Sequence, residues 1–469
     1  MIELTLSEIA GSVSGTLIVP PGAEAPEVVS GAVQTDSRLV VPGGIFFAKR
    51  GEETDGHLFA ADAVSRGASL VVVEHELPLD VAQIVVADTV AALGALATDV
   101  VARVRALGQL KVVGITGSNG KTTTKNLLRS ILEKAGPTVA PQGSLNNEVG
   151  APLTMLELTN ETRFLVSEMG ASRPGEIARL VRMARPDIGV VLKVGMAHAG
   201  MFGGIDATQA AKTEMVSDLD PDDVAVLNRD DVRVSQMADK TAARVVWFGL
   251  DPRADVIATD IVSSARGTRF TLTLRSGDSR AVDFNILGEH HVYNALAAAT
   301  VAELLGVGPD EIVAGLEAVH RAERWRMEVM GGARGVTVIN DAYNASPDST
   351  AAALKTLARI ADPGGRTVAV LGEMAELGED SGPEHDEIGL LAVRLNISQV
   401  VVVGRGARRM HISTINEGSW DGESVYFDTP DEAFAMLSET LKSGDLVLVK
   451  SSKSAGLRFL GDRLGELFS

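Results

Sequence analysis

Short apolar runs alternate with longer amphipathic stretches along most of the 469-residue chain. Runs of Val, Ile and Leu, such as residues 70–73 and 400–403, have the length of single strands. Several are followed by ten or more residues with helical spacing of apolar positions. This alternation is typical of parallel sheets whose strands are joined by crossover helices, so the pattern predicts an α/β fold.

The strand–helix alternation stops and begins again at two places, which predicts three domains. A chain of this length also suggests three domains, at roughly 150 residues per domain. Residues 1–108 are expected to form a small α/β domain with strands near 44–48 and 69–73 and helices near 57–66 and 90–106. Residues 109–328 are expected to form a central P-loop ATPase-like domain, and residues 329–469 a Rossmann-like domain. We expect the hinge between the last two at Gly331-Gly332.

The strands expected in the two larger domains are short and rich in β-branched residues. In the central domain they span 111–116, 164–167, 188–194 and 224–227, with helices at 122–134 and 291–305. In the C-terminal domain they span 336–340, 367–371, 399–403 and 446–450. Residues 270–274 and 282–286 alternate apolar and polar positions around a turn, which predicts an antiparallel hairpin at the edge of the otherwise parallel central sheet.

Composition narrows the class of protein. The chain has 43 Lys and Arg against 62 Asp and Glu, a net charge of −19, and 45% hydrophobic residues. The hydrophobic content excludes wholesale disorder, and the acidic balance argues against nucleic acid or an anionic membrane as partner. The absence of Cys excludes disulfides and thiolate chemistry. No secretory signal or membrane-length apolar run is visible, so we expect a cytoplasmic protein.

The strongest chemical signal is a glycine-rich loop between an expected strand and an expected helix. It reads Gly117, Ser118, Asn119, Gly120, Lys121, Thr122, Thr123. Backbone N–H groups of such a loop cradle phosphates, Lys121 can reach the β- and γ-phosphates, and Thr122 can hold Mg²⁺. Ile115 stands where a full Walker A motif has its first Gly, so this is a shortened G-x-x-G-K-T loop. A glycine-rich turn with a surface Lys is the alternative. The base-reading N-K-x-D of GTPases is absent, which leaves a kinase or a ligase.

Three further stretches carry a resemblance to a known family, namely residues 144–154, 340–349 and 371–378. Together with the loop, these stretches resemble the Mur ligase family, and the resemblance covers nearly the whole chain. Members of that family are ATP-dependent amide-forming ligases of peptidoglycan precursor synthesis. The resemblance implies addition of D-alanyl-D-alanine to UDP-N-acetylmuramoyl-tripeptide through an acyl phosphate, with ATP and two Mg²⁺ ions. The D-N-P-R motif usual in the sibling that adds the third residue is absent.

The resemblance also implies catalytic roles for Lys121 and for three residues outside the loop. Glu168 and His198 match the family's Mg²⁺ ligands, and Lys212 matches a lysine that CO₂ converts to a carbamate. From the residues alone, Glu168 could be a capping acid, His198 a polar loop residue and Lys212 a solvated helix residue. Carbamylation needs a neutral amine, so it predicts a lowered pKa for Lys212.

Nucleotide contacts are implied for residues of both larger domains. Asn294 matches the family residue that contacts adenine, although it could equally be a polar residue on an apolar helix. The family's His-Asn pair before it is here His290-His291, which leaves the role of His291 open. Arg326 and Asp341 match nucleotide-contacting positions. Because Trp325 replaces the Gly usual before that Arg, Arg324 is a competing candidate.

Substrate contacts are implied at eight positions. They are Ser37 and Arg38 for the uridine diphosphate, Asn146 and Asn147 for the muramoyl-peptide, and Tyr343, Asn344, Ser346 and Lys453 for the dipeptide or nucleotide. The segment around Ser346 also reads as a helix N-cap. Lys453 replaces an Arg of the family's Lys-Gly-Ser-Arg motif and lacks its bidentate fork, which weakens carboxylate binding.

Three other functions stay open at this point. One is a sibling ligase that adds a single amino acid, diaminopimelate or lysine, and another is folyl-polyglutamate synthase, against which the UDP-binding first domain argues. The third is a nucleotide-binding regulatory protein without turnover, against which the presence of Lys121, Glu168 and His198 argues. We expect a monomer.

Overall fold

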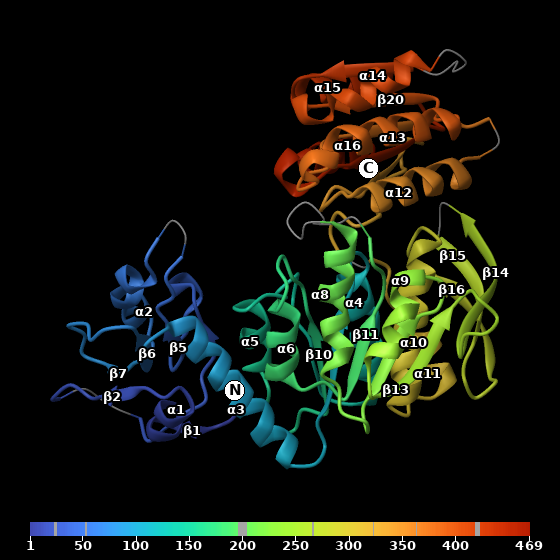
Figure 1. Ribbon diagram of the computed structural model, residues 1–469. Coiled ribbons are helices and arrows are strands. Elements are labelled where there is room, and N and C mark those ends of the chain that lie inside the picture. Colours follow the sequence, from blue (N-terminus) through green and yellow to red (C-terminus); the bar gives the residue numbers. More distant parts are fainter. Residues whose placement is uncertain are drawn as a thin grey trace.

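A computed structural model of the chain contains three units in sequence order, each built on its own main sheet (Figure 1). The structure describes residues 1–22, 26–51, 54–195, 204–264, 267–321, 323–362, 364–417 and 423–469. The C-terminal unit lies above the central unit in Figure 1, and the N-terminal unit lies to one side. None of the helices in these ranges is long and apolar enough to cross a membrane.

The N-terminal unit has a five-stranded sheet of order β2-β7-β6-β5-β4 and a separate β1–β3 pair. Its elements are β1 Leu4–Thr5, α1 Leu6–Ser12, β2 Thr16–Ile18, β3 Val28–Val29, β4 Val33–Gln34, η1 Ser37–Leu39, β5 Ile45–Phe47, η2 Gly56–Phe59, α2 Ala60–Ser65, β6 Leu70–Val73, β7 Ala82–Val85 and α3 Thr89–Ala106. Asp88 caps α3 by accepting hydrogen bonds from the N–H groups of Val90 and Ala91. The buried face of α3 belongs to a core shared with the central unit.

The central unit has a nine-stranded sheet of order β16-β15-β14-β13-β12-β11-β8-β10-β9. Its elements are β8 Lys111–Thr116, α4 Lys121–Ala135, β9 Thr138–Val139, α5 Gly150–Met155, β10 Phe164–Glu168, α6 Glu176–Ala184, β11 Ile188–Val191, α8 Ile205–Ser217, β12 Val224–Asn228, α9 Val232–Ser235, η3 Gln236–Lys240, β13 Arg244–Gly249, β14 Val256–Ser264, β15 Gly267–Thr273, β16 Ser279–Phe284, α10 His290–Leu304 and α11 Pro309–Glu317. Neighbouring strands are parallel along the sheet from β9 through β10, β8, β11, β12 and β13 to β14. The β14–β15 and β15–β16 pairs are antiparallel. The hairpin predicted at the sheet edge is therefore confirmed.

The C-terminal unit has a six-stranded sheet of order β17-β18-β22-β19-β20-β21, parallel except for β17. Its elements are β17 Glu328–Gly331, β18 Thr337–Asn340, α12 Pro347–Ile360, β19 Thr367–Leu371, η4 Gly378–Asp380, α13 Ser381–Arg394, β20 Gln399–Val403, η5 Arg405–Ala407, α14 Arg408–Asn416, β21 Glu423–Phe427, α15 Pro430–Thr440, β22 Leu446–Lys450, η6 Lys453–Ala455 and α16 Leu457–Leu467.

Gly331-Gly332, where we expected the hinge, is a turn inside the C-terminal sheet. Gly331 pairs with Thr337 across the β17–β18 hairpin, and the N–H of Gly332 donates to the carbonyl of Val336 at 2.8 Å. Both glycines have positive φ, which suits a tight hairpin turn. The hinge position is therefore wrong. The connection between the two units precedes β17, which begins at Glu328, and the domain boundaries at 108 and 328 stay predictions.

Candidate active site

A cavity of about 590 Å³ lies between the carboxyl ends of the central strands and the C-terminal unit. Parallel α/β sheets place ligands at this edge. Sequence-predicted residues that line the cavity are Ser118, Asn119, Gly120, Lys121, Thr122, Thr123, Asn146, Asn147, Glu168, Asn294, Arg326, Asp341, Tyr343 and Asn344. The central and C-terminal units thus contribute to one site.

The glycine-rich loop turns directly from β8 into α4. Gly120, at the N-cap of α4, has φ +88°, a conformation that residues with a Cβ rarely adopt. A Cβ at Gly120 would also collide with the amide of Asn294 on α10. The shortened loop therefore needs glycine here for both its backbone turn and the close approach of α10.

Lys121 folds back over this loop. Its Nζ donates to the carbonyl of Gly117 at 2.8 Å. Burial lowers the pKa of Lys121, and the nearby Arg326 lowers it further, while Glu168 opposes the shift. A phosphate chain bound in the loop would add negative charge beside this partly buried lysine and so favour its charged form.

Glu168 ends β10 and is only 1% exposed. Its Oε1 accepts from Nδ2 of Asn146 at 2.7 Å, and its Oε2 has no hydrogen-bond partner among the residues that the structure describes. An unpartnered buried carboxylate oxygen is costly unless a cation or donor completes it. Thr122 supplies a hydroxyl on the same cavity wall.

These groups fit a Mg²⁺ ion held by one carboxylate, one hydroxyl, phosphate oxygens and water, which is how Mg²⁺ is usually bound beside nucleotides. In the ranges that the structure describes, no three His, Asp or Glu side chains converge into a metal cage. His198, the other expected metal ligand, lies outside the described residues.

Lys212 lies on α8 with its side chain 2% exposed. Burial lowers its pKa to about 7, and the neighbouring charge of Lys121 adds to the shift, while Glu214 and Glu176 oppose it. The lowered pKa that carbamylation requires is therefore present. Lys212 is not among the described residues that line the cavity.

Three polar side chains of α10 border the loop. Nδ2 of Asn294 and Nδ1 of His291 are 2.9 Å apart. Burial lowers the pKa of His290 to about 4 and that of His291 well below its usual value, so both rings are neutral at pH 7. His291, whose role the sequence left open, lines the cavity and holds the amide of Asn294.

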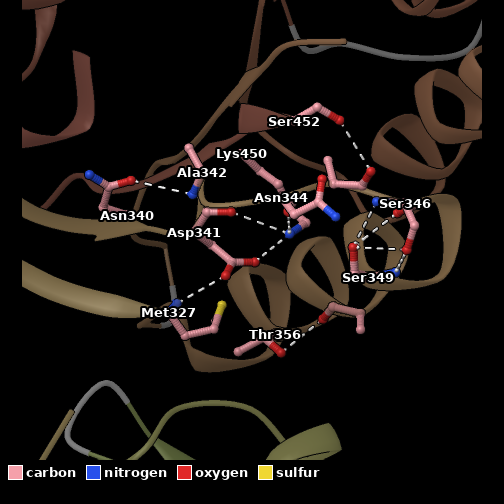
Figure 2. A network of polar contacts seen from close by, with 12 residues as sticks. Met327, Asn340, Asp341, Ala342, Asn344, Ser346, Ser349, Thr356, Lys450 and Ser452 are labelled. Atoms are coloured by element: carbon pink, nitrogen blue, oxygen red, sulfur yellow. Dashed lines mark hydrogen bonds and ion pairs between the residues drawn. The ribbon is translucent and has the colours of Figure 1, made fainter. Parts of the chain in front are cut away.

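The C-terminal unit presents a buried ion pair to the cavity. Nζ of Lys450 contacts Oδ2 of Asp341 at 2.6 Å and also donates to the carbonyl of Asn344 at 3.1 Å. Oδ1 of Asp341 accepts the N–H of Met327 at 3.0 Å. Figure 2 shows the Asp341 carboxylate between these two partners. Lys450 ends β22 and stands at the Lys of the stretch that resembles the Lys-Gly-Ser-Arg motif, but no role was predicted for it, although its place at a strand's carboxyl end was a usable signal.

The structure separates the two candidate arginines. Arg326 lines the cavity, donates to Oγ1 of Thr122 at 3.4 Å and lies over the ring of Tyr343 at 4.3 Å. Arg324 is absent from the cavity lining and pairs with Asp462 of α16 at 3.1 Å. The hydroxyl of Tyr343 donates to Ser144 at 3.3 Å, a second contact between the two units.

Four predicted substrate residues lie outside this cavity lining. Ser346 is the buried N-cap of α12, the alternative that the sequence had left open. Lys453 has its Nζ 5.8 Å from the centre of the Tyr343 ring. Ser37 and Arg38 belong to η1 of the N-terminal unit, where Arg38 is exposed and pairs with Asp36 at 2.6 Å. Gly117 supports the loop from behind and is also outside the lining.

Several cavity residues were missed from the sequence besides Lys450. They are Ser144, Gly170, Ala171, Ser172, Glu176, Leu192, Lys193, Asn228, Asp230, Asp231, His290, Tyr293 and Ser349. Lys193 and Asn228 stand at or just after the carboxyl ends of β11 and β12. A systematic reading of strand ends would have found these two.

Three family models match the chain in order. They describe the Mur ligase family catalytic domain at residues 31–110, the Mur ligase middle domain at 115–302 and the Mur ligase glutamate ligase domain at 325–453. The chain belongs to the Mur ligase family. Members of this family are ATP-dependent amide-forming ligases, so the predicted family and enzyme class are confirmed.

Individual relatives agree over the whole length. The chain is 42% identical to the UDP-N-acetylmuramoyl-tripeptide--D-alanyl-D-alanine ligase of Mycobacterium leprae, over 99% of this chain and 98% of the relative. A crystal structure of MurF from Acinetobacter baumannii matches with a TM-score of 0.88 and 32% identity, over 99% of both chains. MurF ligase from Thermotoga maritima, solved in complex with ADP, matches with a TM-score of 0.80 and 28% identity, over 94% of this chain and 97% of that one.

Proposed function

We propose that this Mur ligase joins D-alanyl-D-alanine to UDP-N-acetylmuramoyl-tripeptide, using ATP, in peptidoglycan precursor synthesis. The observation that carries the proposal is one shared cavity in which the P-loop of the central unit faces Arg326, Asp341 and Lys450 of the C-terminal side. The substrate assignment is supported by full-length similarity to dipeptide-adding ligases.

The reaction must first activate a carboxylate, which is a poor acyl donor. The terminal carboxylate of the tripeptide attacks the γ-phosphorus of ATP, ADP leaves, and an acyl phosphate forms. The neutral amine of the dipeptide then attacks the acyl carbon, phosphate leaves, and the nitrogen gives up one proton to solvent as the amide bond forms. The first step brings two anions together, and the second places an amine against an anionic acyl phosphate, so positioning and charge neutralisation do most of the catalysis.

The cavity residues suit these tasks. Lys121 and the N-terminus of α4 would hold the β- and γ-phosphates, and Arg326 would add a second cation from the opposite wall. Asn294 would contact adenine, with His291 fixing its amide. Asn146 and Asn147, on the loop before α5, would contact the muramoyl-peptide, while Tyr343 and Asn344 would contact the dipeptide or nucleotide.

Glu168 and Thr122 would hold one Mg²⁺ ion, and His198 a second. When bound, Mg²⁺ neutralises phosphate charge. We also propose that CO₂ carbamylates Lys212, because its pKa of about 7 leaves a substantial neutral fraction at physiological pH. Native mass spectrometry with and without bicarbonate tests this. An unchanged mass in bicarbonate, with the protein fully folded, would rule the carbamate out.

Ser37 and Arg38 in the N-terminal unit would bind the uridine diphosphate, and Lys453 the dipeptide carboxylate. A cytoplasmic location and a monomeric state complete the proposal, the latter open to sedimentation measurements. None of these assignments needs a basic protein, because local cations and the helix N-terminus supply the positive charge.

The decisive experiment measures phosphate release with ATP, UDP-N-acetylmuramoyl-tripeptide and a panel of acceptors. We expect release with D-alanyl-D-alanine and little with diaminopimelate, lysine or glutamate. Release with a single amino acid but not with the dipeptide would favour a sibling ligase instead. Nucleotide binding without release for any acceptor would favour the regulatory alternative.

A further inference from the structure

The segment that carries Arg326 has an unusual backbone. Trp325 has φ +60° and Met327 has φ +49°, so two bulky residues on either side of Arg326 adopt the left-handed region. Such residues are rarely found there, and they stay only where surrounding contacts hold them.

The indole of Trp325 is fixed to the C-terminal unit by a polar contact. Its Nε1–H lies 3.0 Å from both carboxylate oxygens of Asp462 on α16. Asp462 also pairs with Arg324 at 3.1 Å and accepts from Nδ2 of Asn340, at the end of β18, at 3.1 Å. The guanidinium of Arg458 lies over the same indole at 5.5 Å. Asp462 therefore joins the segment to a helix and to a strand of the sheet.

Backbone contacts of the segment also go to the C-terminal unit. The carbonyl of Trp325 accepts the N–H of Tyr343 at 3.0 Å. The N–H of Met327 donates to Asp341 at 3.0 Å, the contact visible in Figure 2, and the Met327 side chain is buried in the core beside α12. Arg326 lies between Trp325 and Met327 in sequence, but its side chain extends toward the central unit and donates to Thr122 of the P-loop.

We propose that Trp325, through Asp462, is a positioning residue for nucleotide binding. It holds the backbone so that Arg326, carried by the C-terminal unit, points at the P-loop of the central unit. The indole contact with Asp462 selects one conformation of the segment. The proposal rests on the proposed ATP site and adds to it a residue that does not itself touch nucleotide.

The test measures the affinity of the full chain for an ATP analogue with a non-hydrolysable γ-phosphate, by calorimetry in the presence of Mg²⁺. Trp325→Phe keeps a ring but removes the Nε1–H donor, and we expect the dissociation constant to rise about tenfold because Arg326 loses its fixed direction. Asp462→Asn should raise it in the same way, since it weakens the contact from the other side. Affinity equal to wild type in both variants would overturn the proposal.

Arg326→Ala separates positioning from a general structural effect. If Trp325 acts through Arg326, the double variant Trp325→Phe/Arg326→Ala should bind the analogue no more weakly than Arg326→Ala alone. An additive loss in the double variant would contradict the proposal. In steady state, KM for ATP should rise in Trp325→Phe while KM for the UDP-sugar peptide stays unchanged.

Asp431→Asn is the matched control. Asp431 pairs with Arg463 of α16 at 2.6 Å, so its loss removes an ion pair from the same helix away from the segment. We expect wild-type affinity, and a loss equal to that of Asp462→Asn would mean that α16 as a whole is responsible, which overturns the proposal. A wild-type chain that binds the analogue but releases no phosphate with the dipeptide would refute the proposed function alone.

Discussion

Lys125 is the clearest place to perturb the site without touching a substrate. It lies on α4, one turn after Lys121, and its side chain is fully buried. Its Nζ donates to the carbonyls of Pro141 at 2.6 Å and Gly143 at 3.0 Å. These carbonyls begin a loop, residues 141–147, that carries Ser144, Asn146 and Asn147 into the cavity. Lys125 therefore joins this loop to the helix of the P-loop.

The change is Lys125→Met, which keeps the length of the side chain and removes the ammonium group. Two hydrogen bonds from a charged donor are lost, at roughly 1.5–3 kcal/mol each. Burial lowers the pKa of Lys125, which shows that burying the ammonium carries a cost, and removing that cost offsets part of the loss. We expect the free energy of unfolding to fall by about 2–3 kcal/mol.

Urea-induced unfolding followed by circular dichroism measures the stability, and phosphate release measures the activity. Because Asn146 holds Oε1 of Glu168, a loosened loop should also lower kcat/KM for the UDP-sugar peptide about tenfold or more. Lys134→Met is the control, since Lys134 is exposed on the same helix and should change stability by less than about 0.5 kcal/mol. Equal effects of the two variants, or wild-type kcat/KM in Lys125→Met, would refute the reasoning.

Three further changes test the site. Lys121→Ala should lower turnover at least about a hundredfold with the fold intact by circular dichroism, because the main cation at the phosphates is lost, and full activity would mean that the loop is not the ATP site. Glu168→Gln keeps the acceptor for Asn146 but removes a charge, so it should raise the Mg²⁺ concentration needed for half-maximal rate about tenfold; an unchanged Mg²⁺ titration would count against a metal role. In buffer freed of CO₂, where Lys212 is an unmodified amine, burial lowers its pKa to about 7 from a reference of 10.5, so between about pH 7 and 10.5 the unfolded chain binds more protons and the free energy of unfolding should rise with pH by up to about 1.4 kcal/mol per unit. Urea titrations at several pH values should show a flatter rise for Lys212→Met, and parallel curves would contradict the buried, neutralised lysine.

Much of the fold could be predicted because its signals are local. Strands such as Thr367–Leu371 and Gln399–Val403 match the predicted ranges, since a buried parallel strand is a short continuous run of β-branched residues. The hairpin of β15 and β16 was predicted from period-two alternation and confirmed. By contrast, the strand expected to reach Val194 ends at Val191, because an apolar run does not mark where pairing stops. The hinge predicted at Gly331-Gly332 was wrong for a similar reason, since a pair of glycines can form a hairpin turn as well as a hinge.

The sequence by itself determined the phosphate loop, since the turn from strand to helix and its glycines lie within one short stretch. Motifs spread along the chain also identified the family. Only the tertiary structure decided which groups face that loop. Packing places Arg326, and not Arg324, beside the loop. It also pairs Lys450 with Asp341 and brings His291 next to Asn294. The physical reason is that strands and helices remote in sequence end at one sheet edge, and the direction of each side chain there depends on neighbours that no local pattern specifies.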